Sequence, residues 1–208
     1  MFAEMRTALG IPKSIDILNH IYSLPASHQP GAMAAIRAIE STAMKAQVPQ
    51  PGLASLMTYL DDRGIPKGIC TRNFDGPVAH LLGKFLAGSV FHPIVTREFR
   101  PPKPDPAGIL HIAKAWGLVR SEEDARDEGE GQLGGEALRV VADASGLIMV
   151  GDSMDDMAAG RRAGAATVLL ANDVNGDIVE HENTDLVINR LDELIEILEN
   201  GFEGRKMG

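Results

Sequence analysis

The feature that most constrains the fold is an alternation between helical patterns and short apolar runs, which begins after the Pro49–Gly52 boundary. The helical patterns repeat apolar residues every three or four positions, whereas the apolar runs are too short for helices and end at turn residues. The expected strands are 65–70, 94–96, 147–150, 167–170 and 186–188. Because intervening helices let successive strands run parallel, this pattern predicts an α/β fold with a parallel sheet over residues 48–208.

Residues 1–47 contain helical patterns only, in three segments separated at Gly10 and Pro25. Ser14 is expected to cap the second helix. Pro30 is expected in the first turn of the third helix, where a proline is tolerated. The sequence therefore predicts a small helical domain over residues 1–47, ahead of the α/β domain.

Helices are also expected beside the strands, and several of them end near a glycine. Asp105 and Pro106 mark the start of one of them, as an N-cap and a first-turn proline. Residues 138–145 read as a further helix. Residues 122–135 are rich in acids and glycines and have no apolar period, so a solvated, mobile loop is expected there. An acidic binding surface is the alternative interpretation of that segment.

The charge balance excludes several classes of partner. The chain has 20 Lys and Arg against 29 Asp and Glu, a formal net charge of -9. Nucleic acids and anionic membranes attract basic surfaces, so we expect neither as a partner and expect a small molecule instead. No apolar run approaches the roughly 18 residues that a membrane helix needs. A single cysteine, Cys70, rules out an internal disulfide and favours a reducing, cytoplasmic location.

Three polar segments follow expected strands, at the edge where open α/β sheets bind their ligands. The first is Cys70-Thr71-Arg72-Asn73. A hydroxyl and backbone N–H groups at a strand end can hold a phosphoryl oxygen. A threonine that only caps a turn is the alternative interpretation.

The second segment is Arg100-Pro101-Pro102-Lys103-Pro104-Asp105-Pro106. Its lysine is fixed between prolines ahead of a helix, where a compact cation can offset carboxylate and phosphate charge. An exposed lysine in a rigid turn is the alternative.

The third segment begins with Gly151 at the end of a strand and continues as Asp152-Ser153-Met154-Asp155-Asp156 into a helix. Hard carboxylate oxygens so close together suit magnesium. The alternative is that these acids only cap the helix and complement its dipole. The density of acids behind a buried strand favours the metal site.

The three segments together resemble the second, third and fourth motifs of the haloacid dehalogenase superfamily, in its phosphoglycolate-phosphatase-like branch. The matching residues are Thr71-x-Asn73, Lys103-Pro104-Asp105-Pro106 and Gly151-Asp152-Ser153-x-x-Asp156-x-x-x-Gly160. Their order and spacing agree with that family, and the resemblance covers nearly the whole chain. It implies a three-layer α/β/α fold with a Rossmann-like parallel sheet, in which residues 1–47 are a remnant of a helical cap.

The resemblance also implies roles for individual residues. The phosphate-binding residues would be Thr71, Arg72, Asn73 and Lys103. Thr71 and Lys103 would act in catalysis, Thr71 by binding the transferred phosphoryl group and Lys103 by stabilising its charge. Mg²⁺ would be the cofactor, with Asp152 as its ligand and Asp156 as support for the metal site. The expected activity is hydrolysis of a small phosphorylated metabolite.

The chain departs from the family in one respect, because the family's first motif is an apolar strand followed by Asp-x-Asp-Gly. That motif supplies the nucleophile, and these 208 residues do not contain it. Asp75 and Asp143 are not expected to replace it, since neither follows an expected strand. The family's first strand is central, between strands 65–70 and 147–150. We expect it ahead of Met1 in a longer protein, because unpaired buried strand edges are costly.

Two functions therefore remain open. The first is a magnesium-dependent phosphatase that is active at full length and inactive as the present chain. The second is a catalytically dead phosphate-binding or regulatory module of the same fold.

Overall fold

A computed structural model describes residues 1–121 and 140–201. The segment 122–135, expected to be a mobile loop, lies outside these described residues. The chain forms two compact units, one of residues 1–49 and 76–85 and one of residues 50–75 and 86–208. The assignment of residues 1–47 as a cap remnant stays a prediction.

The helical unit contains α1 (Phe2–Leu9), α2 (Ile17–Ser23), α3 (Gln29–Lys45) and most of α5 (Asp75–Phe85). Its interior is formed by apolar side chains that the periodic pattern places on one face of each helix: Met5, Ile17, Leu18, Ile21 and Ile36. These helices confirm the helical patterns expected for residues 1–47.

The cap of α2 differs from the expected one. Asp16, not Ser14, precedes the helix and accepts hydrogen bonds from the N–H groups of Leu18 at 3.0 Å and Asn19 at 2.9 Å. The reason is local, because a cap must lie directly before the first helical residue, and Ser14 is two residues too early.

The second unit confirms the α/β prediction. Strands β5 (Ile148–Gly151), β6 (Ala166–Leu170) and β7 (Leu186–Ile188) form a parallel sheet in that order. Strands β1 (Ile69–Cys70) and β2 (Ile94–Val95) form a second parallel pair. Among the described residues β1 pairs only with β2, and β5 only with β6, so the two parallel groups are not hydrogen-bonded to each other.

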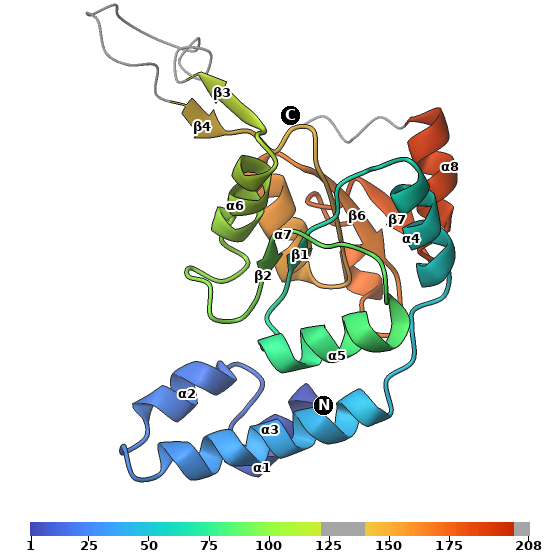
Figure 1. The fold of residues 1–208 in the computed structure, drawn as a ribbon. Coiled ribbons are helices and arrows are strands. Elements are labelled where there is room, and N and C mark those ends of the chain that lie inside the picture. The colour runs from blue at the N-terminus through green and yellow to red at the C-terminus, as the bar shows by residue number, and fades with distance from the viewer. Residues whose placement is uncertain (122–139, 202–208) are drawn as a thin grey trace, which may run out of the picture. The chain divides into compact units, whose positions relative to one another are not determined.

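Helices cover these strands and bury one main core. Helix α7 (Met154–Ala163) packs against β5, β6 and α6 (Ala107–Ala115), while α4 (Leu53–Asp62) packs against α8 (Glu193–Asn200) (Figure 1). The core around α6 and α7 consists of buried apolar residues: Val95, Ile109, Ile112, Ala113, Ala144, Leu147, Ala159 and Ala165. This packing fixes the start of α7 at the end of β5, which positions the acidic segment.

The expected helix at 138–145 is wrong. Residues Val140–Ala142 form β4, which pairs antiparallel with β3 (Val119–Ser121). The two valines in β4 favour extended backbone. Each of the two strands has only 3 residues, and a short apolar run does not distinguish a strand from a helix.

A buried polar network connects α7 to the sheet. The Asp185 carboxylate, 1% exposed, forms an ion pair with Arg161 and accepts a 2.8 Å hydrogen bond from the Thr167 N–H. The Thr167 hydroxyl donates to the Asn183 carbonyl at 2.6 Å. An ion pair in such a position depends on both partners, because removal of one leaves a desolvated charge.

We predict that Asp185→Ala lowers the free energy of unfolding by about 3–5 kcal/mol, the usual loss when one partner of a buried pair is removed. Urea unfolding measures this loss. The matched control is Glu199→Ala, which removes the partner of Arg63 from a pair whose side chains are 48% and 49% exposed. This control is expected to cost less than about 1 kcal/mol. Equal small losses in both variants would contradict the assigned role of the network.

Candidate active site

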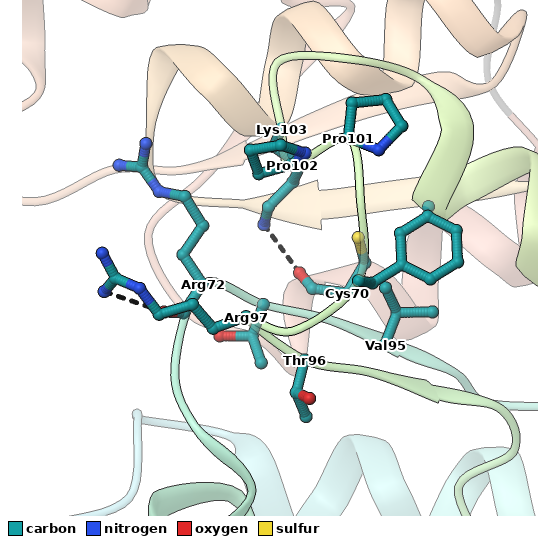
Figure 2. A pocket seen from close by; sticks show the side chains of 11 residues that line it. Cys70, Arg72, Val95, Thr96, Arg97, Pro101, Pro102 and Lys103 are labelled. Atoms are coloured by element: carbon teal, nitrogen blue, oxygen red, sulfur yellow. Dashed lines mark hydrogen bonds between the residues drawn. The ribbon is translucent and has the colours of Figure 1, made fainter. Parts of the chain in front are cut away.

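A pocket lies at the carboxyl ends of β1 and β2 and beside the loop before α6 (Figure 2). It is lined by Cys70, Thr71, Arg72, Val95, Thr96, Arg97, Phe99, Pro101, Pro102, Lys103 and Gly108. The charged side chains in this lining are Arg72, Arg97 and Lys103, and all three are cations. The pocket therefore suits an anionic ligand. Two of the three sequence motifs thus meet at one place.

Thr71 extends the hydrogen bonding between β1 and β2 and begins the turn that follows β1. Its N–H donates to the Val95 carbonyl at 2.8 Å, and its hydroxyl oxygen accepts a 3.1 Å hydrogen bond from the Asn73 N–H. The Asn73 carbonyl in turn accepts the Arg97 N–H at 2.9 Å. Thr71 therefore caps a turn, and its hydroxyl hydrogen can still be donated to a ligand. Asn73 shapes this turn through its backbone and does not line the described pocket.

Lys103 is held inside the structure. Its side chain is 10% exposed, and its Nζ donates to the Cys70 carbonyl at 2.6 Å and forms an ion pair with Asp156. Figure 2 shows the ammonium reaching toward the end of β1. The alternative interpretation of Lys103 as an exposed loop lysine is wrong. Pro102 and Pro104 restrict the loop around it, which favours this placement.

Asp156 has two roles at the start of α7. One carboxylate oxygen accepts hydrogen bonds from the Ser153 hydroxyl at 2.7 Å and from the N–H groups of Asp152 and Ser153 at 3.2 Å each. The other oxygen faces Lys103. Gly151 permits this close approach, because a Cβ atom there would lie 2.3 Å from the Asp156 Cβ. Asp156 is therefore a helix-capping residue and the anchor of Lys103 at the same time.

Asp152 remains available for a cation. It is exposed to solvent and forms no ion pair among the described residues. The protein atoms around its carboxyl remove part of its hydration, and this desolvation, with the negative charge of Asp156, raises the pKa of Asp152. A carboxylate in such a position is stabilised by a bound cation.

Magnesium fits these residues only in part. No group of three potential metal-ligating side chains occurs among residues 1–121 and 140–201. Mg²⁺ commonly uses one or two carboxylates and completes its shell with water and substrate phosphate. Asp152 meets that need, whereas the oxygens of Asp156 already have four partners. The metal role of both residues stays a prediction, with Asp152 as the better ligand.

The third acid of the segment has a different partner. Asp155 forms a 2.6 Å ion pair with Arg72, whose side chain is 47% exposed. This pair connects the turn after β1 to the first turn of α7. Arg72 thus lines the pocket while its charge is shared with Asp155.

Arg97 is a pocket residue that the sequence analysis missed. Its Nη1 donates to the Arg72 carbonyl at 3.3 Å, and its guanidinium lies 5.6 Å from the centre of the Phe74 ring. Arg97 comes directly after the expected strand 94–96. The rule that singled out Thr71, a polar residue at the carboxyl end of a strand, would have found it.

No described residue is a convincing nucleophile in the pocket. Burial raises the pKa of the Cys70 thiol, which disfavours the reactive thiolate. Asp143 follows β4, outside the pocket lining, and hydrogen bonds from the Ser145 N–H and hydroxyl lower its pKa. Asp75 begins α5 and is also outside that lining.

Comparisons with known proteins identify the family of this chain. Residues 10–164 match the family described as hydrolase, haloacid dehalogenase-like hydrolase. An uncharacterised hydrolase of Saccharomyces cerevisiae is 42% identical over 206 residues, which are 96% of this chain and 84% of that protein. A phosphoglycolate phosphatase of Pseudomonas syringae pv. syringae is 30% identical over 147 residues, which are 70% of this chain and 45% of that enzyme.

Among solved structures, a hydrolase from Pseudomonas syringae aligns with a TM-score of 0.69 at 18% sequence identity. The alignment covers 97% of this chain and 90% of the solved chain, and it shows the fold alone. No helix in the described part of the chain combines the length and the apolar character that a membrane span requires.

The raised pKa of Asp152 makes a prediction about stability. A carboxyl whose pKa is higher in the folded state than in the unfolded state destabilises the folded protein once it is ionised. We therefore expect Asp152→Asn to raise the melting temperature at pH 7 without divalent cations, and this gain to shrink as the pH falls toward about 4. Thermal unfolding in a chelator at both pH values measures the effect.

The control for this prediction is Asp155→Asn, which removes a carboxylate that has a cationic partner. It is expected to leave stability unchanged or slightly lower, since exposed pairs contribute about 0–1 kcal/mol. A melting temperature that falls in Asp152→Asn at pH 7 would count against an unfavourably placed carboxylate.

Proposed function

Because the chain belongs to the haloacid dehalogenase-like hydrolase family, in its phosphoglycolate-phosphatase-like branch, we propose that it forms the phosphate-binding core of a magnesium-dependent phosphatase. Its substrate would be a small phosphorylated metabolite. The proposed location is the cytoplasm, in keeping with the single cysteine.

The observation that carries this proposal is the placement of the Lys103 ammonium. It lies at the end of β1, where Thr71 follows Cys70, and is held by the Cys70 carbonyl and Asp156. Phosphoryl transfer depends mainly on positioning and on neutralising charge. A cation whose position is already fixed does not need to be ordered when the substrate binds, so it would act as a preorganised charge beside the phosphoryl oxygens.

The residues of the proposed site would have separate roles. The Thr71 hydroxyl would donate a hydrogen bond to the phosphoryl group, together with backbone N–H groups of the turn that contains Arg72 and Asn73. Asp152 would hold Mg²⁺, which supplies further charge neutralisation when bound. Asp156 would keep Lys103 and the start of α7 in place.

The nucleophile is proposed to come from outside these 208 residues. Family resemblance assigns it to an aspartate on an apolar strand that ends in Asp-x-Asp-Gly, and we place that strand between β1 and β5. Its carboxylate would form a bond to phosphorus as the bond to the leaving oxygen breaks, and the second aspartate of the motif would protonate that oxygen. Water would then attack the acyl phosphate, releasing inorganic phosphate and the free carboxylate. Within the described residues the β1–β2 pair and the β5–β6–β7 sheet are not hydrogen-bonded to each other, and a strand between β1 and β5 would connect them, which supports this placement.

A catalytically dead phosphate-binding module is the second candidate. The lack of a described aspartate in the pocket lining favours it. The two candidates differ in one observable, since only the first gains turnover when the strand with Asp-x-Asp-Gly is supplied.

We predict that the chain as given does not release phosphate from an aryl phosphate with Mg²⁺. Addition of an apolar strand ending in Asp-x-Asp-Gly ahead of Met1 is expected to create that activity. In the extended protein Lys103→Ala should lower kcat by about 100-fold or more, the scale for one preorganised charge-stabilising group. Steady-state kinetics with a continuous phosphate assay measures both effects.

The control is Lys114→Ala, because Lys114 is an exposed lysine on α6 and should leave kcat unchanged. Turnover by the chain as given would overturn the assignment of the nucleophile. An extended protein that binds phosphate but stays inactive would favour the dead module instead.

A further inference from the structure

The carboxyl ends of β5 and β6 are joined by a side chain that belongs to neither strand. The paired register of these strands ends at Gly151 and Leu169, and Asp152 and Leu170 follow these two residues. The Asn175 Nδ2 group donates to the carbonyl of Asp152 at 3.0 Å and to the carbonyl of Leu170 at 3.0 Å. One side-chain amide thereby connects the ends of the two strands.

The amide of Asn175 is itself fixed. It is 4% exposed, and its Oδ1 accepts a 2.8 Å hydrogen bond from the Asn172 N–H. The backbone carbonyl of Asn175 accepts a 3.0 Å hydrogen bond from the Ile178 N–H, at the 3₁₀ turn Gly176–Ile178. Both N–H groups of the side-chain amide therefore donate hydrogen bonds and its oxygen accepts one. Because a flipped amide would lose these bonds, the side chain has one favoured orientation.

The hydrogen bond to Asp152 restrains the residue that is proposed to hold the metal. The Asp152 N–H donates to Asp156, and the Asp152 carbonyl accepts from Asn175, so its backbone is held from both sides. A side chain leaves its Cα in a direction set by that backbone. Ligand-orienting contacts of this kind commonly determine metal affinity.

We infer that Asn175 is a positioning residue that fixes the backbone at Asp152 and thereby directs its carboxylate for Mg²⁺. The metal part of this inference rests on the proposed function, whereas the restraint of the backbone does not. Asn175 acts through Asp152 and touches neither the pocket lining nor the proposed phosphoryl site.

The test uses two variants of the chain as given, Asn175→Ala and the isosteric Asn175→Asp, which lacks the N–H donors. Without metal, amide hydrogen exchange of Asp152 and Ser153 should become at least about fivefold faster, the factor that one net hydrogen bond represents. Affinity for Mg²⁺, measured by calorimetry, should fall by about 10–100-fold, the usual effect of removing a ligand-orienting contact.

The matched control is Thr184→Val, which removes another buried hydrogen bond of the same region, from the Thr184 hydroxyl to the Ile178 carbonyl at 3.0 Å. It is expected to lower the melting temperature without changing either readout at Asp152. This control separates positioning from a general loss of stability.

Each outcome decides the inference. Unchanged exchange at Asp152 and Ser153 in both Asn175 variants overturns it, as does an equal acceleration in Thr184→Val. If exchange accelerates as expected but the unaltered chain binds no Mg²⁺, the backbone role stands and the proposed metal site fails. If Mg²⁺ binds equally well to the unaltered chain and to both variants, the role toward the metal is wrong.

Discussion

The contact of Lys103 with Asp156 and the Cys70 carbonyl is the interaction on which the site depends. It connects three segments that are far apart in sequence: the loop before α6, the end of β1 and the start of α7. Both side chains are close to fully buried, at 10% and 8% exposure. Because each charge is costly to desolvate alone, the two hold one another in a single arrangement.

That arrangement uses ordinary local structure for a chemical purpose. Asp156 accepts the bonds that any helix N-terminus needs, and Ser153 completes the capping box. The same carboxylate then faces Lys103, which leaves Asp152 as the acid of this segment that forms no ion pair with the residues the structure describes. A common capping motif therefore divides the acids of one short segment into an anchor, an ion-pair partner of Arg72 and a candidate metal ligand.

Much of the fold and part of the candidate site could be predicted from sequence, where the signal is local. Apolar periodicity predicted the parallel strands and their helices, and the motif order placed Thr71 and Lys103 at one sheet edge. The β3–β4 pairing was missed because each strand has only 3 residues, and a short apolar run does not distinguish a strand from a helix. Asn175 was missed for a similar reason, since an asparagine in a loop has no pattern until the fold brings it to the Asp152 carbonyl.

The central claim is that Lys103 and Asp152 form one charge-neutralising site for a phosphoryl group and Mg²⁺. The most direct measurement is calorimetric binding of inorganic phosphate to the chain as given, with and without Mg²⁺, and to Lys103→Met and Thr71→Val. We expect Mg²⁺ to tighten phosphate binding and each substitution to weaken it. Phosphate binding that is unaffected by Mg²⁺ and by both substitutions would contradict the account.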